Sequence, residues 1–325
     1  MSDLSNPEIS SSARPDPSAQ SFDLDAALTS IVGVRTNIPE ESLTAAILGT
    51  ERAGHGILIN EEGLIVTIGY LITEAQTVWL TDCRGHTVPG HVVGYDQETG
   101  LGLVQALQRV DLSPLTMGHC ADLDPTHAVI VASHGGIGHA MNAQVVAKRE
   151  FAGYWEYVLD EAIFTAPAHP SWGGAGLIGM DGKLYGVGSL LVQESDEAGH
   201  AADSNMFVPI DLLRTVMEDL QLYGRPNRTA RPWLGIFVYD VGDYLVVAGV
   251  FKDCPAHRAD LRPGDVVVDV NGQPVSSLAH LFRTIWALGP AGVEVPLTLV
   301  RDSVKIDVTV RSEDRDQLLR TEQLH

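Results

Sequence analysis

The stretch 167-PAHPSWGGAGLIGMDGKLYGVGSLLV-192 indicates the kind of fold that most of the chain adopts. It begins as a glycine-rich loop, continues as a hydrophobic strand, turns at Asp181-Gly182 and ends as a second strand. Similar short runs of Val, Ile, Leu and Thr recur between clusters of Gly, Asp, Asn and Pro on both sides of it. About a dozen short strands, with turns every 8–12 residues or so, favour a sandwich or a pair of barrels over βαβ units.

The composition indicates a folded, acidic protein. The chain has 325 residues, enough for two or three compact units. Apolar residues make up 45% and charged residues 19%, so most of the chain is expected to bury a core. The formal net charge is −21, from 42 acidic and 21 basic residues. Because such a surface repels phosphate backbones, nucleic acid and anionic membranes are poor partners.

The termini and the cysteines bear on location. The sequence has no apolar window of roughly 18 residues or more, so no membrane span is expected. Residues 1–20 lack both the basic and the apolar region of a secretory signal. Cys83, Cys120 and Cys254 form an odd set without metal-type spacing, which favours free thiols in a reducing compartment. We therefore expect a cytoplasmic protein, or a periplasmic one if a signal has been removed.

The histidines are the remaining candidates for metal ligands. His127, His134 and His139 form one group along the sequence, and His86 and His91 form another. Neither spacing matches a compact metal site. We expect scattered surface or core histidines, and neither a metal nor another cofactor.

The best domain boundary is 224-GRPNRTARP-232, which combines Gly, two Pro, Asn and three Arg. It follows a predicted helix, 211-DLLRTVMEDLQLYG-224, which ends at its glycine. We therefore predict a disordered tail at 1–21, a first domain at 22–223, a linker at 224–232, a second domain at 233–311 and a polar tail at 312–325.

Three blocks of the first domain are informative together: 54-GHGILINEEGLIVTIGYLI-72, 92-VVGYDQETGLGLV-104 and 169-HPSWGGAGLIGMDG-182. They resemble blocks of the HtrA family, in which a trypsin-like protease precedes a PDZ domain. The resemblance covers about residues 45–311. It implies a mainly β fold: a trypsin-like double β-barrel at 22–223, followed by a PDZ domain at 233–311.

The resemblance also implies where the catalytic triad of the family would lie. Read without gaps, the histidine position holds Tyr70, the aspartate position Gly100 and the serine position Gly173. Triad chemistry needs a nucleophilic oxygen, an imidazole and a carboxylate, and glycine supplies none of them. With a pKa near ~10, tyrosine is a poor general base at neutral pH. The family label would be serine endopeptidase, but we predict a pseudoprotease without catalytic residues.

Two interpretations of residues 169–176 stay open. The segment is either a glycine-rich surface loop or part of a remodelled cleft that binds without cutting, with His169, Ser171 and Trp172 as its candidate residues. Ser171, two residues before the expected nucleophile, is also the candidate for a relocated active site. A serine endopeptidase with an atypical active site is therefore the alternative hypothesis.

The run 254-CPAHRADLRPGDVVVDVNGQPV-275 resembles the signature of PDZ domains, and 233-WLGI-236 stands where they carry their carboxylate-binding loop. The resemblance implies that the N–H groups of Leu234, Gly235 and Ile236 bind a peptide C-terminus, while the peptide adds a strand to the sheet. Arg231 would add positive charge near that carboxylate. The candidates for the side-chain pocket, some of which we expect to face the core instead, are Leu278, Leu281, Phe282 and Ile285.

Together these observations predict a protein that binds rather than cuts. We expect a scaffold or accessory subunit that engages a protein or peptide C-terminus through its PDZ domain. A homo-oligomer, a trimer by resemblance to the family, is a further hypothesis, and 20-QSFDLDAALTSIV-32 is the segment that would form it.

Overall fold

The computed structural model describes residues 6–195 and 201–320. These residues form two compact units. The first takes in the described residues up to Arg149 together with Glu161–Asn227, and the second takes in Glu150–Asp160 and Arg228–Arg320. No helix in the described ranges is long and apolar enough to cross a membrane.

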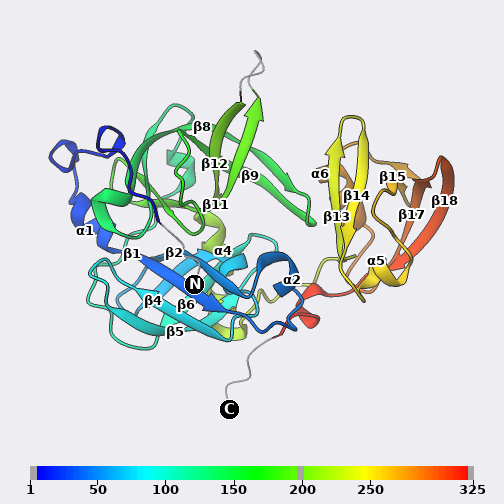
Figure 1. The fold of residues 1–325 in the computed structure, drawn as a ribbon, viewed down its shortest axis with the longest axis horizontal. Coiled ribbons are helices and arrows are strands. Elements are labelled where there is room, and N and C mark those ends of the chain that lie inside the picture. The colour runs from blue at the N-terminus through cyan, green and yellow to red at the C-terminus, as the bar shows by residue number, and fades with distance from the viewer. Residues whose placement is uncertain (1–5, 196–200, 321–325) are drawn as a thin grey trace. The chain divides into compact units, whose positions relative to one another are not determined.

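The first unit contains two closed, six-stranded antiparallel barrels (Figure 1). The first barrel has the order β1-β2-β3-β6-β5-β4. Its strands are β1 (Ile31–Asn37), β2 (Glu51–Leu58), β3 (Leu64–Ile68), β4 (Thr77–Thr81), β5 (Thr87–Tyr95) and β6 (Leu101–Ala106). The second barrel has the order β10-β11-β12-β9-β8-β7. Its strands are β7 (Ala128–Ala132), β8 (Ala140–Gly153), β9 (Tyr157–Ala166), β10 (Gly176–Gly179), β11 (Leu184–Ser195) and β12 (Ala201–Pro209).

The hydrophobic pattern explains the strands of the barrels. The continuous apolar run 64-LIVTI-68 becomes β3, in which all five residues are buried. β1 instead alternates between buried and more exposed positions toward its end, as expected of a strand with one face in the core. At the stretch 167–192, Gly176–Gly179 and Leu184–Ser195 pair as the antiparallel strands β10 and β11. The predicted strand, turn and strand of that stretch are therefore present.

Short helices connect and cover the barrels. α1 (Leu24–Thr29) begins at Asp23, whose carboxylate accepts from the N–H of Ala26 at 3.0 Å. α2 (Ala45–Leu48) precedes β2, and α3 (Gly69–Ile72) directly follows β3. α4 (Asp211–Tyr223) ends at Gly224, as predicted. The remaining helices of this unit are single 3₁₀ turns: η1 (Ser11–Ala13), η2 (Pro17–Ala19), η3 (Cys120–Asp122) and η4 (Gly136–His139).

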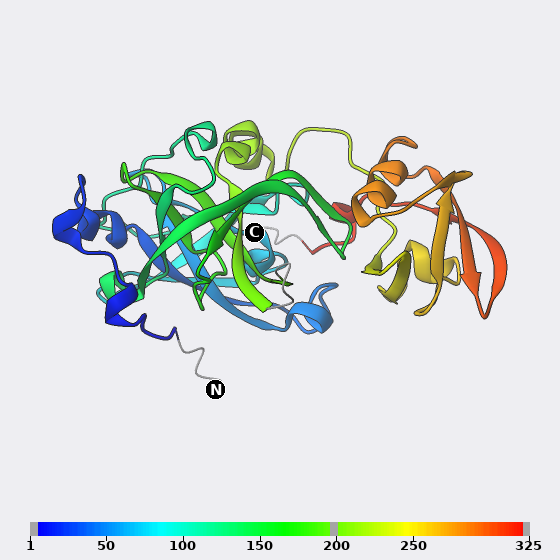
Figure 2. The same cartoon turned by 90° about the horizontal axis from the view of Figure 1, so that it is seen from above.

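The second unit is built on one sheet, in which the strands follow the order β13-β14-β15-β17-β18 and β16 pairs with β15 (Figure 2, yellow to red). The strands are β13 (Ile236–Val241), β14 (Tyr244–Val250), β15 (Val266–Val270), β16 (Gln273–Pro274), β17 (Glu294–Arg301) and β18 (Val304–Arg311). The helices are α5 (Pro255–Arg258), α6 (Leu278–Trp286) and the 3₁₀ turn η5 (Arg315–Gln317). α6 begins at Ser277, whose hydroxyl accepts from the N–H of His280. β13 stands at the end of the strand order and is therefore an edge strand.

The predicted fold class, mainly β with two barrels before a smaller unit, is confirmed by these sheets. The structure differs from the prediction at the tails. Residues 6–21 were expected in a disordered tail, yet Ile9 is buried and its N–H donates to the carbonyl of Gly138 at 2.8 Å. In the expected polar C-terminal tail, Leu319 is buried and Trp233 pairs with Glu313. Single apolar residues in polar segments gave too weak a signal to predict these contacts. Residues 1–5 and 321–325 of the predicted tails lie outside the described ranges.

Candidate functional site

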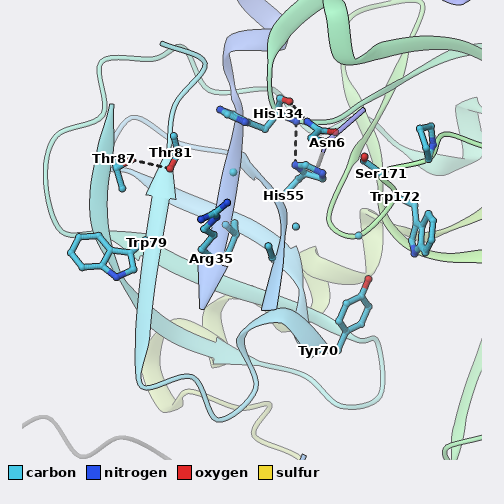
Figure 3. Close-up of a pocket in the computed structure, with 16 residues that line it drawn as sticks. Asn6, Arg35, His55, Tyr70, Trp79, Thr81, Thr87, His134, Ser171 and Trp172 are labelled. Carbon is cyan, nitrogen blue, oxygen red and sulfur yellow. Dashed lines mark hydrogen bonds between the residues drawn. The ribbon is translucent and has the colours of Figure 1, made fainter. Parts of the chain in front are cut away.

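A cleft of about 910 Å³ opens in the first unit, where residues of both barrels meet (Figure 3). The first barrel contributes residues of β1, β2, β4 and β5 and Tyr70 of α3, and the second contributes His134 and the segment Pro170–Gly173. Asn6, from the segment before η1, also lines it. The cleft contains two of the three positions at which the family resemblance places the triad, Tyr70 and Gly173.

Tyr70 and Gly173 face each other in this cleft. The Tyr70 hydroxyl donates a hydrogen bond to the carbonyl of Ser189 at 3.0 Å. A Cβ atom added at Gly173 would lie 2.8 Å from the Tyr70 hydroxyl oxygen, closer than nonbonded atoms approach. Burial raises the pKa of Tyr70 above its usual range, so the phenol stays protonated at neutral pH. Tyr70 therefore fills the space that a larger side chain at position 173 would need.

Gly100 lies beside the same helix. Its carbonyl accepts from the N–H of Gly69, the residue before Tyr70, at 2.6 Å. The structure thus brings the three positions of the predicted triad into one neighbourhood. Gly100 offers a backbone carbonyl there and has no carboxylate that could orient a base.

In the loop around Gly173, three backbone amides donate hydrogen bonds within the protein. The N–H of Ser171 donates to Nδ1 of His169 at 3.0 Å, and the N–H of Ala175 donates to the carbonyl of Trp172 at 3.0 Å. The N–H of Gly174 donates to the carbonyl of Gly188 at 2.8 Å. An oxyanion hole needs amides that are free to point at the substrate. The amide two residues before position 173 is already used by His169.

The three predicted cleft residues divide into two groups. Ser171 and Trp172 line the cleft, whereas His169 is fully buried and does not line it. His169 is fixed by Asn205, which accepts from its N–H at 2.6 Å, and by the carbonyl of His139, to which its Nε2 donates at 3.1 Å. Within the described ranges the Ser171 hydroxyl makes no hydrogen bond to an imidazole. Arg35, His55 and Trp79 also line the cleft, but no sequence pattern indicated them, because they come from three separate strands.

Four histidines, His55, His134, His139 and His169, lie close to one another beside the cleft. His55 accepts from the N–H of His134 through Nδ1 at 3.2 Å, and Nε2 of His134 donates to the carbonyl of Asp82 at 2.8 Å. Burial lowers the pKa of His55 to about 3 and that of His169 to about 4, so both rings are neutral at neutral pH. No group of three or more ligating side chains in the described ranges could hold a metal ion.

These two pKa values predict a strong loss of stability in acid. Each ring binds a proton near pH ~6.5 when unfolded but only near pH 3–4 when folded, so stability falls as the pH drops through this window. From pH 6.5 to pH 5 each histidine should contribute a loss of about 2 kcal/mol. Urea unfolding of His55→Gln should show a pH slope smaller by about 1.4 kcal/mol per unit, while the exposed-site control His86→Gln keeps the slope of the unmodified protein. An unchanged slope in His55→Gln would show that His55 is protonated in the folded protein.

In the second unit, the three predicted carboxylate-binding amides already hold a carboxylate. Oε1 of Glu156 accepts from the N–H groups of Gly235 at 2.7 Å, Ile236 at 3.0 Å and Leu234 at 3.3 Å. Oε2 accepts from Leu234 at 3.0 Å. Burial raises the pKa of Glu156 to about 7, against the amides and Arg315, which lower it. Sequence reasoning missed Glu156 because it lies about 80 residues before the loop.

The other predicted peptide-binding residues differ in how deeply they are buried. Leu281, Phe282 and Ile285 are fully buried in the apolar core of the second unit, and Leu278 packs against this core while partly exposed. Arg231 was expected near the carboxylate, but its guanidinium lies 4.3 Å from the ring centre of Trp286 on α6. The Trp286 ring gives this cation an aromatic partner, and the place of Arg231 near the carboxylate stays a prediction.

Comparisons with known proteins agree with this architecture. The family described as a trypsin-like peptidase domain matches residues 54–187, and the PDZ domain family matches residues 232–311. Several solved structures share the fold. The HtrA-type protease AlgW with a tripeptide is 20% identical with a TM-score of 0.51, over 92% of this chain and 97% of that one. A serine endoprotease from Yersinia pestis is 21% identical with a TM-score of 0.50, over 89% and 95%.

Curated relatives are named probable periplasmic serine endoprotease DegP-like. The protein from Halomonas elongata is 26% identical over 270 residues, which is 79% of this chain and 55% of the relative. The one from Pseudomonas fluorescens is 25% identical over 281 residues, 81% and 57%. The chain thus spans little more than half the length of the curated relatives that it matches. The two domain matches show a trypsin-like peptidase domain followed by a PDZ domain, and these relatives and solved structures show that the chain is similar to proteases of the HtrA family.

Proposed function

We propose that the chain is a non-catalytic HtrA-like pseudoprotease that acts as a protein-binding, scaffold or accessory subunit. One observation carries the proposal: the Tyr70 hydroxyl stands 2.8 Å from where a Cβ atom would lie at position 173. A nucleophilic side chain has no room at that position while Tyr70 keeps its place. Hydrolysis by this family's chemistry would also need a base and an orienting carboxylate, which Tyr70 and Gly100 do not supply.

The surroundings of position 173 support the same conclusion. The Ser171 amide donates to His169, so the loop lacks one of the free amides that would stabilise an oxyanion. Mutations that remove such a donor reduce kcat by roughly a hundredfold to a thousandfold in serine proteases. Without the nucleophile, the base and this amide donor, the cleft lacks the groups that peptide-bond hydrolysis by this family's chemistry requires.

The cleft can still bind a polypeptide. Its lining combines the aromatic rings of Trp79 and Trp172 with the guanidinium of Arg35 and the backbone of β1 and β2. Aromatic and arginine side chains are the residues that most often dominate protein interfaces. We propose that the cleft holds a protein segment, and that the PDZ domain supplies the second binding surface through the amides of Leu234, Gly235 and Ile236.

A serine endopeptidase with an atypical active site is the second candidate, and the names of the curated relatives favour it. Ser171 is its candidate nucleophile because it lines the cleft. Labelling with a fluorescent fluorophosphonate separates the candidates. We expect no labelling of the unmodified chain, whereas an active DegP-like relative labels in parallel. Labelling that disappears in Ser171→Ala would establish the second candidate.

Location and assembly are further parts of the proposal. The names of the relatives favour the periplasm over the predicted cytoplasm, and periplasmic location is the alternative that the sequence left open. For the proposed oligomer, Leu24, Leu28 and Ile31 of the candidate segment are buried within the chain itself, which leaves little of its apolar surface for a partner. A mass measurement in solution tests the trimer.

A further inference from the structure

The hairpin between β8 and β9 places Glu156 on the carboxylate-binding loop of the PDZ domain. Glu156 is 8% exposed, and its two oxygens accept four hydrogen bonds from three successive backbone amides. Successive backbone amides that converge on one carboxylate are the means by which a domain captures a peptide C-terminus. An internal side chain therefore occupies the position of a ligand's terminal carboxylate.

The backbone of the hairpin tip follows the edge of the PDZ sheet as well. The N–H of Val238, in the edge strand β13, donates to the carbonyl of Tyr154 at 2.9 Å. This is the type of hydrogen bond that an added strand makes with an exposed edge. Glu156 itself has φ +62°, a left-handed conformation that non-glycine residues rarely adopt. Such strain persists where the surrounding contacts fix the residue.

Side chains of the hairpin tip also contact the groove between β13 and α6, which is the part of a PDZ domain in which a bound peptide lies. Val158 is buried in the same apolar cluster as Leu281, Phe282 and Ile285 of α6. The ring of Tyr154 stacks on that of Tyr239 with centroids 4.8 Å apart. The hairpin therefore contacts the carboxylate loop, the edge strand and the α6 core, which are the three parts that a bound peptide would use.

Charge pairs close the hairpin over α6. Arg283 of α6 forms ion pairs with Glu150 and Asp160, which flank the hairpin tip on its two strands. All three side chains are substantially exposed, so each pair adds little stability by itself. Their position on both sides of the tip nevertheless fixes its register relative to the groove.

We propose that residues 154–158 are an internal pseudoligand of the PDZ domain, and that Glu156 closes the groove until a partner with a free C-terminal carboxylate displaces it. The proposal rests on the proposed function of the PDZ domain as a site for peptide C-termini. The partner's carboxylate would take the three amides, and its backbone would replace Tyr154 beside β13. Occupation of the groove by a partner and docking of the hairpin in it are then mutually exclusive states of one unit.

Two measurements on the full chain test the proposal, one on release and one on binding. Hydrogen exchange reports release: in Glu156→Gln, amides of 150–160 and 234–238 should exchange at least about tenfold faster than in the unmodified protein, because a charge-assisted contact is lost. Glu156→Ala should act in the same direction. Glu161→Gln changes an exposed carboxylate on strand β9, which follows the hairpin tip; it is the matched control and should leave exchange unchanged.

Fluorescence anisotropy then measures binding of a fluorescein-labelled pool of decapeptides ending in valine, prepared with either a free carboxylate or a C-terminal amide. The free-carboxylate pool should bind Glu156→Gln at least about tenfold tighter than the unmodified protein, and the amide pool should show no such gain. Equal binding of the carboxylate pool to both proteins would overturn the pseudoligand while keeping peptide recognition. Release of the hairpin without binding of either pool would instead remove peptide recognition, and the pseudoligand with it. Unchanged exchange would overturn the closed state directly.

Discussion

Gly174→Ala is expected to lower the free energy of unfolding by about 4 kcal/mol or more. Gly174 has φ +78°, and a Cβ atom there would lie 1.8 Å from the carbonyl oxygen of His55. That oxygen belongs to β2, which is paired with β1 and β3. Because the obstacle is backbone in the middle of a barrel, it cannot move aside as a flexible side chain would.

Gly85→Ala is the matched control for this substitution. Gly85 has φ +81°, but a Cβ atom there would meet nothing within 4 Å. It should cost only the left-handed strain, about 1–2 kcal/mol. Urea unfolding of both variants separates strain from collision. Equal losses would mean that the loop after Gly173 can shift away from β2, and the argument for a fixed cleft geometry would then fail.

Asp265→Asn is expected to destabilise the PDZ unit by about 3 kcal/mol. The carboxylate of Asp265 is 1% exposed and accepts from Nε and Nη2 of Arg301 at 2.7 and 2.8 Å. It also accepts from the N–H of Arg262 at 2.8 Å. Burial acts to raise the pKa of Asp265, but these hydrogen bonds outweigh it and hold the pKa below its usual range. Because Asp265→Asn removes the buried negative charge, Arg301 keeps an ion pair only with the exposed carboxylate of Asp260.

The exposed carboxylate of Asp260 provides the control, because it pairs with the same arginine at 3.2 Å. Its side chain is 65% exposed, so Asp260→Asn should cost less than about 1 kcal/mol. Differential scanning calorimetry, in which the transition of the PDZ unit is followed, gives both values. Similar losses for the two variants would show that burial does not set the strength of the Asp265–Arg301 pair.

Much of the fold could be predicted from the sequence because its signals are local. The turn at Asp181-Gly182 and the apolar runs on either side gave β10 and β11. The run 254–275 and the helix pattern near 276–288 gave α5, β15, β16 and α6. These elements depend on turn residues and periodicity within a few residues, which is information that a single sequence contains.

The candidate sites depend on contacts between distant residues, and there the sequence was less informative. Tyr70 could be assigned to a degenerate position by resemblance, but its approach to Gly173 required the two barrels to be placed together. Glu156 looked like an ordinary hairpin residue, although its carboxylate meets Leu234, Gly235 and Ile236. His169 was predicted in the cleft, but Asn205 and His139 hold it in the interior.

The most direct test of the central proposal is a proteolysis assay that keeps both binding surfaces accessible. Unfolded, fluorescein-labelled casein is incubated with the unmodified full chain, with Glu156→Gln and, as the positive control, with the DegP-like relative from Halomonas elongata. The Glu156→Gln chain removes the proposed closed state as an explanation for inactivity. We predict no release of fluorescent fragments by either form of this chain above the rate without protein. Fragment release by either form that is lost in Ser171→Ala would contradict the account and make this chain a serine endopeptidase.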